Sequence, residues 1–115
     1  MKLLESFLYD ELKITDKNVY ERFLQYNELL MEWNSKINLI SRSSESIEAQ
    51  VLNSIFFLKN YPIPANSCIA DIGTGGGFPG IPLKILDDSL NILMADSILK
   101  KVFPGNDRPI LEKMR

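Results

Sequence analysis

A run of glycines in the second half of the chain is the feature best suited to chemistry. It reads Asp71-Ile-Gly-Thr-Gly-Gly-Gly-Phe-Pro-Gly80 and follows a short apolar stretch. This order predicts a strand, a tight turn and the first turn of a helix, an arrangement in which α/β proteins bind nucleotides at the carboxyl end of a strand. The run therefore predicts a site for a nucleotide or another adenosine-containing cofactor.

The spacing of these glycines leaves two classes of cofactor open, and a nearby charge favours one of them. The segment from Gly75 to Gly80 satisfies the G-x-G-x-x-G spacing of dinucleotide sites, with Asp96 near the expected place of a ribose-binding acid. Asp71, however, precedes Gly73 by two residues, where a carboxylate repels a pyrophosphate but attracts an ammonium or sulfonium group. Charge therefore favours S-adenosylmethionine. The chain contains no G-x-x-x-x-G-K-[ST] motif, so a nucleoside triphosphatase loop is not expected.

Purely structural explanations also exist at several of these positions. Glycines in a strand-to-helix turn can serve only for positive φ and close packing. Asp96 can simply begin a loop or cap a following helix at Ser97, and Lys100 and Lys101 can be solvated rather than bound to phosphate. These alternatives stay open at the level of the sequence.

The composition excludes several other kinds of site. With one cysteine and no histidine in 115 residues, the chain cannot form an intramolecular disulfide, a Cys/His zinc site or an imidazole-dependent triad, and we expect no metal. A net charge of −2 means that an RNA partner requires a local basic patch. No apolar stretch is long enough to span a membrane, and the start does not resemble an export signal, so we expect a cytoplasmic protein. The oligomeric state is not indicated.

The elements that position the glycine run begin with helices. Apolar residues at three- and four-residue steps predict a helix over residues 3–12. A longer helix begins after Thr15 or Asp16 and weakens at Asn34. Its apolar stripe is unusually aromatic, which we interpret as packing on a core rather than as stacking on a base or cofactor.

A third helix closes the helical region. Ser43 or Ser44 can cap it, and it ends before Asn60 and a pair of prolines. We therefore expect two parts: an N-terminal helical region, residues 1–61, and a partial cofactor-binding α/β domain, residues 62–115.

Beyond the prolines the apolar pattern changes to that of buried strands. Residues 67–72 and 91–95 have the length of such strands, and the helix between them has Pro79 in its first turn. Together they predict one βαβ unit, residues 67–96, with a right-handed crossover. The expected fold class is α/β, with N-terminal helices followed by this unit.

Three segments, in this order and spacing, resemble one known family. They are Trp33-Asn-Ser-Lys-Ile-Asn-Leu39, then Asp71 to Leu83, then Asp96-Ser97 followed by Lys100-Lys-Val102. Residues 20 to 102 resemble the glucose-inhibited division protein B family of small-subunit ribosomal RNA guanine-N7 methyltransferases. Phe-Pro-Gly-Ile-Pro after the glycines looks like this family's own signature. The resemblance implies the first βαβ unit of a Rossmann-like methyltransferase fold, its sheet incomplete, with S-adenosyl-L-methionine as cofactor and small-subunit ribosomal RNA as partner.

Carried over position by position, the resemblance implies roles for five residues. Gly73 and Phe78 border the cofactor, Asp71 and Gly75 shape its pocket, and Asp96 holds the adenosine ribose. No catalytic residue is identified among them.

Two further residues, and one departure, concern the neighbourhood of this site. The resemblance places Asn38 and Ser54 in motifs near the cofactor. Where the family usually shows His-x-x-Asp-Ser, the chain reads Gln50-Val-Leu-Asn-Ser54, which removes an ionisable pair.

A larger departure from the family pattern begins after Val102. Residues 103–109 are rich in helix breakers, whereas the family continues with a helix and further strands. We therefore expect a truncated or frame-shifted product or a gene-model fragment, which by itself is inactive and binds the methyl donor weakly or not at all. Its catalytic residues would lie beyond its end.

The activity expected of the parent protein is methyl transfer from S-adenosylmethionine to a guanine ring nitrogen. That nitrogen is already nucleophilic, so the reaction needs alignment of base and sulfonium more than a general base. Two alternatives remain: a dinucleotide-dependent oxidoreductase fragment, and a non-catalytic helical interaction module that retains the loop.

Overall fold

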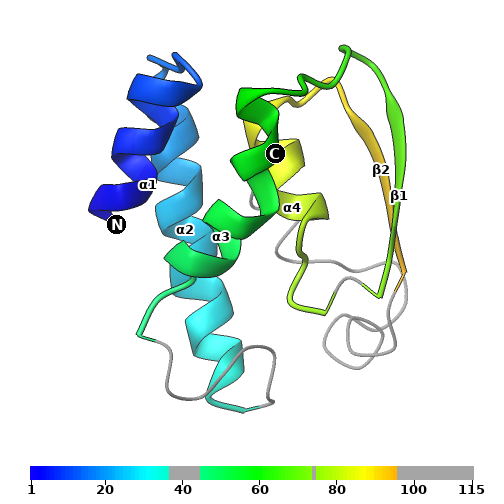
Figure 1. The fold of residues 1–115 in the computed structure, drawn as a ribbon. Helices are drawn as coiled ribbons and strands as arrows, with labels where there is room; N and C mark the ends of the chain where they lie inside the picture. The colour runs from blue at the N-terminus through cyan, green and yellow to red at the C-terminus, as the bar shows by residue number, and fades with distance from the viewer. Residues whose placement is uncertain (37–44, 74, 96–115) are drawn as a thin grey trace.

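The computed structural model describes residues 1–36, 45–73 and 75–95. The elements are α1 (Lys2–Ser6), the π-helical η1 (Phe7–Glu11), α2 (Lys17–Asn34), α3 (Glu48–Ile55), the 3-10 helix η2 (Phe56–Lys59), β1 (Cys68–Ile72), α4 (Gly80–Leu86) and β2 (Asn91–Ala95). Figure 1 shows α1, α2 and α3 on one side and the two strands on the other, with α4 between them. Helix α4 contacts α2, α3 and β2, so it joins the helical part to the sheet.

The first two predicted helices are confirmed, with detail that the sequence pattern did not contain. The helix predicted over residues 3–12 is α-helical as far as Ser6 and π-helical from Phe7. Asp16 rather than Thr15 caps α2, because its side chain accepts a hydrogen bond from the Asn18 N–H at 2.9 Å. The two helices therefore form where their apolar stripes predict them.

The predicted start of the third helix is wrong. Helix α3 begins at Glu48, with Ile47 as the residue before its first turn, whereas Ser43 and Ser44 lie outside the described residues. The reason is tertiary: the Ile47 side chain is fully buried, and its N–H donates to Asn27 Oδ1 of α2 at 3.0 Å. A contact with α2 therefore helps to set where this helix begins, and the serine beside its start is Ser46, whose Oγ accepts from the Glu48 N–H at 3.3 Å.

The predicted strands and the helix between them are confirmed, except that Pro79 is the residue before α4 and not part of its first turn. Strands β1 and β2 are parallel, with Asp71 opposite Met94 in the register. These two side chains are buried on the face toward α4, whereas Ile72 and Leu93 on the other face are 75% and 66% exposed. The sheet of the described residues thus has one covered face and one open apolar face.

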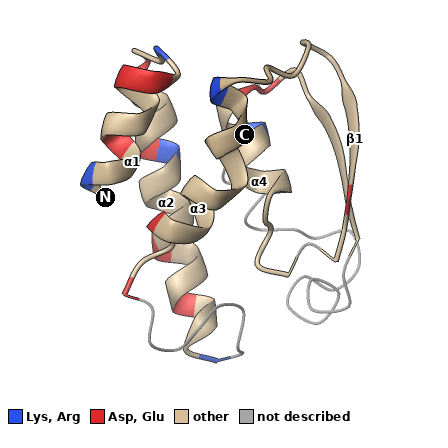
Figure 2. Ribbon diagram, in the orientation of Figure 1, with Lys and Arg blue, Asp and Glu red and all other residues tan. Residues whose placement is uncertain are grey.

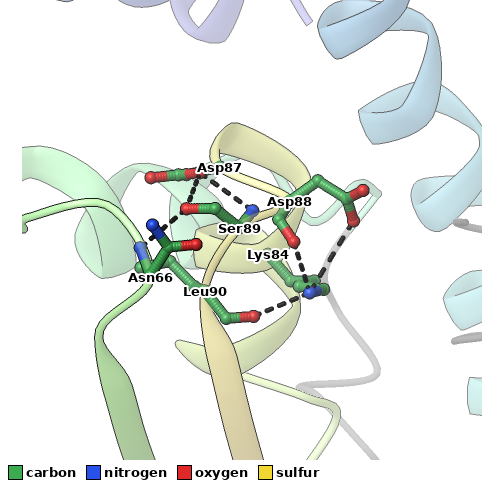
Figure 3. Close-up of polar contacts among 6 residues, drawn as sticks. All are labelled: Asn66, Lys84, Asp87, Asp88, Ser89 and Leu90. Carbon is green, nitrogen blue, oxygen red and sulfur yellow. Dashed lines mark hydrogen bonds and ion pairs between the residues drawn. The ribbon is translucent and has the colours of Figure 1, made fainter.

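A small polar network fixes the turn between α4 and β2 (Figure 3). Lys84 Nζ donates to the carbonyl oxygens of Asp88 and Leu90, both at 2.6 Å. Ser89 Oγ accepts from the Asn66 N–H at 2.9 Å, which ties the same turn to the residues before β1. These bonds hold the start of β2 beside the start of β1.

One hydrophobic core runs through both halves of the chain. Its buried members come from the helices α1 to α4, the residues next to them, and β2. The expected division of the chain into a helical region, residues 1–61, and a partial α/β domain, residues 62–115, stays a prediction. Within the described ranges, no helix is long and apolar enough to cross a membrane.

Candidate functional site

The glycine loop connects the end of β1 to the start of α4, as the sequence predicts. Its backbone has positive φ at three glycines: 73° at Gly73, 58° at Gly75 and 103° at Gly77. The Gly73 N–H donates to the Ala95 carbonyl at 2.7 Å, which attaches the first residue of the loop to the end of β2. The loop therefore begins at the carboxyl end of β1 and beside the carboxyl end of β2, the place where α/β proteins bind ligands.

Gly77 is the position at which a side chain is least acceptable. A Cβ atom there would lie 2.4 Å from Ile81 Cδ1 and 3.0 Å from the Tyr26 hydroxyl oxygen. A φ of 103° is also one that residues with side chains rarely adopt. Close packing under the loop thus requires glycine here.

Asp71 connects the strand to the helix beneath the loop. Its side chain is 7% exposed, and its Oδ2 accepts a hydrogen bond from the Gly80 N–H at 2.9 Å. A Cβ atom on Gly80 would lie 2.9 Å from that oxygen and 2.7 Å from Met94 Sδ, so glycine is needed for this approach. The carboxylate therefore helps to fix the shape of the loop from within.

Tyr26 of α2 supports the loop from the other side. Its hydroxyl donates to the Gly76 carbonyl at 2.7 Å, and its ring lies 5.5 Å from the Phe78 ring, centroid to centroid. The side chain is fully buried. Burial raises the pKa of the Tyr26 hydroxyl, and the nearby Asp71 carboxylate raises it further. The hydroxyl is therefore a neutral donor at physiological pH.

The structure brings four of the five predicted cofactor-binding residues together in this loop. Gly73 is exposed, Gly75 and Phe78 are half-buried, and Asp71 is buried beneath them. Asp96 lies outside the described residues, so its predicted ribose contact stays a prediction.

The two residues that the resemblance places near the site are only partly described. Ser54 is a half-buried residue of α3 whose hydroxyl donates to the Gln50 carbonyl of its own helix at 2.7 Å. Asn38 falls outside the described ranges.

Tyr26 is the residue of this site that reasoning from the sequence missed. It lies on the stripe Val19, Phe23, Tyr26, Leu30, whose steps of four, three and four residues mark one helix face. Core packing is the correct interpretation of this stripe. The signal in the sequence that could have pointed to Tyr26 was its hydroxyl, because a buried tyrosine normally has a hydrogen-bond partner.

A cavity of about 570 Å³ lies elsewhere, between the sheet and α4. It is lined mainly by apolar residues of β1, α4 and β2, together with Lys84 and Asn91. None of the four predicted cofactor-binding residues that the structure describes lines it. The loop, and not this cavity, is therefore the candidate site.

The charges of the described part of the chain are mainly acidic. Figure 2 shows acidic positions along α1 and α2 and on β1, where the residue is Asp71. Lys100 and Lys101, for which both solvation and phosphate contact stayed open, lie outside the described residues. The described surface thus has no general positive field that would attract RNA.

Comparison with known proteins identifies what the chain is similar to. The pattern of the GidB family, described as rRNA small subunit methyltransferase G, matches residues 19–103. Proteins named ribosomal RNA small subunit methyltransferase G match from Lachnoclostridium phytofermentans (44% identity over 89 residues), Clostridium novyi (40% over 109) and a strain of Clostridium botulinum (41% over 103).

These matches cover 76%, 85% and 87% of this chain but 37%, 44% and 43% of the three relatives, in the same order. The chain thus spans about two fifths of their length. No solved structure matches it.

Proposed function

The chain belongs to the rRNA small subunit methyltransferase G family, and from this premise we propose that it carries the cofactor-binding part of an S-adenosylmethionine-dependent methyltransferase. The reaction proposed for the whole protein is methyl transfer to guanine N7 of small-subunit ribosomal RNA. The observation that supports it most is the family match over residues 19–103, which includes the whole glycine loop.

The cofactor proposed for the loop is S-adenosyl-L-methionine. In this proposal Gly73 and Phe78 border the cofactor, Gly75 and Asp71 shape its pocket, and Asp96 accepts from the ribose hydroxyls. The negative charge of Asp71 beneath the loop favours a cofactor with ammonium and sulfonium groups over a pyrophosphate. The parallel strands, with α4 between them in sequence, support the first βαβ unit of a Rossmann-like fold.

The chemistry proposed for the site is alignment. Guanine N7 carries a lone pair that attacks the methyl carbon as the carbon–sulfur bond breaks, leaving S-adenosylhomocysteine and a methylated, positively charged base. In-line positioning of the base and the sulfonium supplies most of what this step needs. Ribosomal RNA as substrate implies a cytoplasmic protein, and the mainly acidic described surface implies that the RNA is bound by other residues.

The activity is tested with a chimera. Residues 1–95 of this chain are joined to the remaining part of the Lachnoclostridium phytofermentans relative, and the unaltered relative is the positive control. Labelled methyl donor and small ribosomal subunits are supplied, and the modified base is mapped by aniline-induced cleavage, which reports N7-methylguanine. We expect methyl incorporation at one guanine. A folded chimera that binds S-adenosylhomocysteine but transfers no methyl group to guanine N7 would contradict the proposal.

The cofactor is tested on the chain itself. Equilibrium titrations compare S-adenosylhomocysteine with NAD, and we expect the chain to prefer the former. A preference for NAD would favour a dinucleotide-dependent enzyme instead.

A further inference from the structure

The contact between Tyr26 and the loop joins residues that lie 50 positions apart in the sequence. The Tyr26 hydroxyl donates to the Gly76 carbonyl at 2.7 Å, and it is the buried end of a side chain from the middle of α2. The helical half of the chain therefore reaches the candidate cofactor loop through a specific polar contact as well as through apolar packing.

This contact fixes the orientation of one peptide group. In a planar trans peptide the carbonyl and the following N–H point in opposite directions. The Gly76 carbonyl points toward α2, so the Gly77 N–H points away from α2. In the described part of the chain no group accepts a hydrogen bond from this N–H. Gly76 and Gly77 are buried, whereas Gly73 is exposed and Gly75 is half-buried, so a ligand is expected on the side of Gly73 and Gly75.

Glycine would not hold this orientation by itself. A loop with several glycines has many accessible backbone conformations, and a peptide between two glycines rotates readily unless something restrains it. Here two contacts of Tyr26 restrain the peptide between Gly76 and Gly77. The Tyr26 ring packs against Phe78 at 5.5 Å, and its hydroxyl would lie 3.0 Å from a Cβ atom on Gly77. The hydroxyl is thus held against both glycines of the peptide.

We propose that Tyr26 is a positioning residue of the cofactor loop: by holding the Gly76 carbonyl toward the core, it presents the Gly77 N–H to the bound cofactor. The role rests on the proposed function, because the orientation of this N–H matters only if the loop binds a ligand. It also assigns the N-terminal helical region a part in cofactor binding, through α2.

The test replaces the hydroxyl and keeps the ring. Tyr26→Phe removes the donor, and Tyr20→Phe is the matched control: Tyr20 lies on the same helix, and its hydroxyl donates to another main-chain carbonyl, that of Met1, at 3.3 Å. Amide hydrogen exchange and the Gly77 nitrogen resonance are measured without ligand. S-adenosylhomocysteine affinity is then measured for the chimera of residues 1–95 with the relative, with and without each substitution.

We expect Tyr26→Phe to move the Gly77 nitrogen resonance and to speed exchange at the Gly80 and Ile81 amides about tenfold, with β1 and β2 amides unchanged. Its affinity for S-adenosylhomocysteine should fall about fivefold, whereas Tyr20→Phe should leave loop exchange and affinity at the wild-type values. If exchange increases equally throughout the chain, the role is structural and the proposal is wrong.

A second variant keeps the proposal testable if Tyr26→Phe does not fold. Tyr26→3-fluorotyrosine has nearly the same shape but is a stronger donor, so it should move the Gly77 resonance in the opposite direction. An unmoved resonance would overturn the proposal. A folded wild-type chimera of residues 1–95 with the remaining part of the relative that binds no S-adenosylhomocysteine would instead contradict the proposed function, which separates the two failures.

Discussion

Asp71 and Gly80, nine positions apart in the sequence, are joined by a hydrogen bond of 2.9 Å from the Gly80 N–H to Asp71 Oδ2. The bond closes the glycine loop at its base, because Asp71 lies near the end of β1 and Gly80 is the first residue of α4. The carboxylate whose charge favours S-adenosylmethionine therefore also has a structural role. Its two roles are separable by experiment.

Asp71→Asn tests the electrostatic role. The amide oxygen can still accept from the Gly80 N–H, but the negative charge is gone. Affinity for positively charged S-adenosylmethionine should fall several-fold more than affinity for S-adenosylhomocysteine, whose sulfur is neutral. Isothermal titration with both ligands measures the ratio. Equal losses for the two ligands would show that the charge does not act on the sulfonium.

Asp71→Ala tests the structural role. It leaves the Gly80 N–H without this acceptor and removes a buried charged side chain, so we expect the free energy of unfolding to fall by about 2 kcal/mol. Asp71→Asn should cost less than half as much in the same urea titration. If the two variants are equally stable, the hydrogen bond to Gly80 contributes little.

Two glycine substitutions separate backbone strain from steric overlap. At Gly75 φ is 58° and a Cβ atom would have nothing within 4 Å, so Gly75→Ala should cost about 1 kcal/mol, from the left-handed backbone alone. Gly77→Ala adds contacts of 2.4 and 3.0 Å to Ile81 side-chain atoms and should cost about 3 kcal/mol or more. Thermal unfolding measures both, and similar values would mean that Ile81 simply moves aside.

Gln50 is a site where substitution should stabilise the protein. Its side-chain Oε1 is buried, and no group of the described residues forms a hydrogen bond with it. Gln50→Met has a similar shape without the unpaired oxygen, and we expect it to raise the free energy of unfolding by about 1 kcal/mol. Gln25→Met, at an exposed position of α2, is the control and should change stability by less than about 0.5 kcal/mol. A destabilised Gln50→Met would show that the amide has a partner in solution.

Alkaline pH should destabilise the chain partly through Tyr26. Burial and the Asp71 carboxylate raise the pKa of Tyr26 well above 10.0, so above that pH the unfolded chain loses this proton while the folded chain keeps it. The stabilisation is therefore complete below pH 10 and decreases as pH rises above it. Tyr26→Phe should lose less stability than wild type between about pH 9.5 and 11, as measured by urea unfolding. Equal slopes would mean that Tyr26 ionises normally.

Much of the fold could be predicted from local patterns. The three- and four-residue steps of apolar side chains indicate α1, η1 and α2, and the short apolar runs indicate β1 and β2. The start of α3 could not be predicted, because the contact of Ile47 with Asn27 involves residues 20 positions apart. Local capping rules describe only the nearest residues.

In the candidate site, too, some features could be predicted from the sequence and others could not. The glycine run, its place after a strand and the acid at its start follow from the order of residues, because turn geometry restricts which residues are allowed. The hydrogen-bond partners of those residues do not follow from the order of residues. That the Gly80 N–H meets Asp71, and that a hydroxyl from α2 meets the Gly76 carbonyl, depends on how elements pack after they form.

The sequence by itself thus determined the family, the βαβ unit and the loop that is expected to bind the cofactor, because each is encoded by neighbouring residues. Tertiary structure alone decided that α2 supports this loop and that Tyr26 orients its backbone. The physical reason is that a buried hydroxyl must find its acceptor in the folded core, and sequence distance does not limit which carbonyl that is.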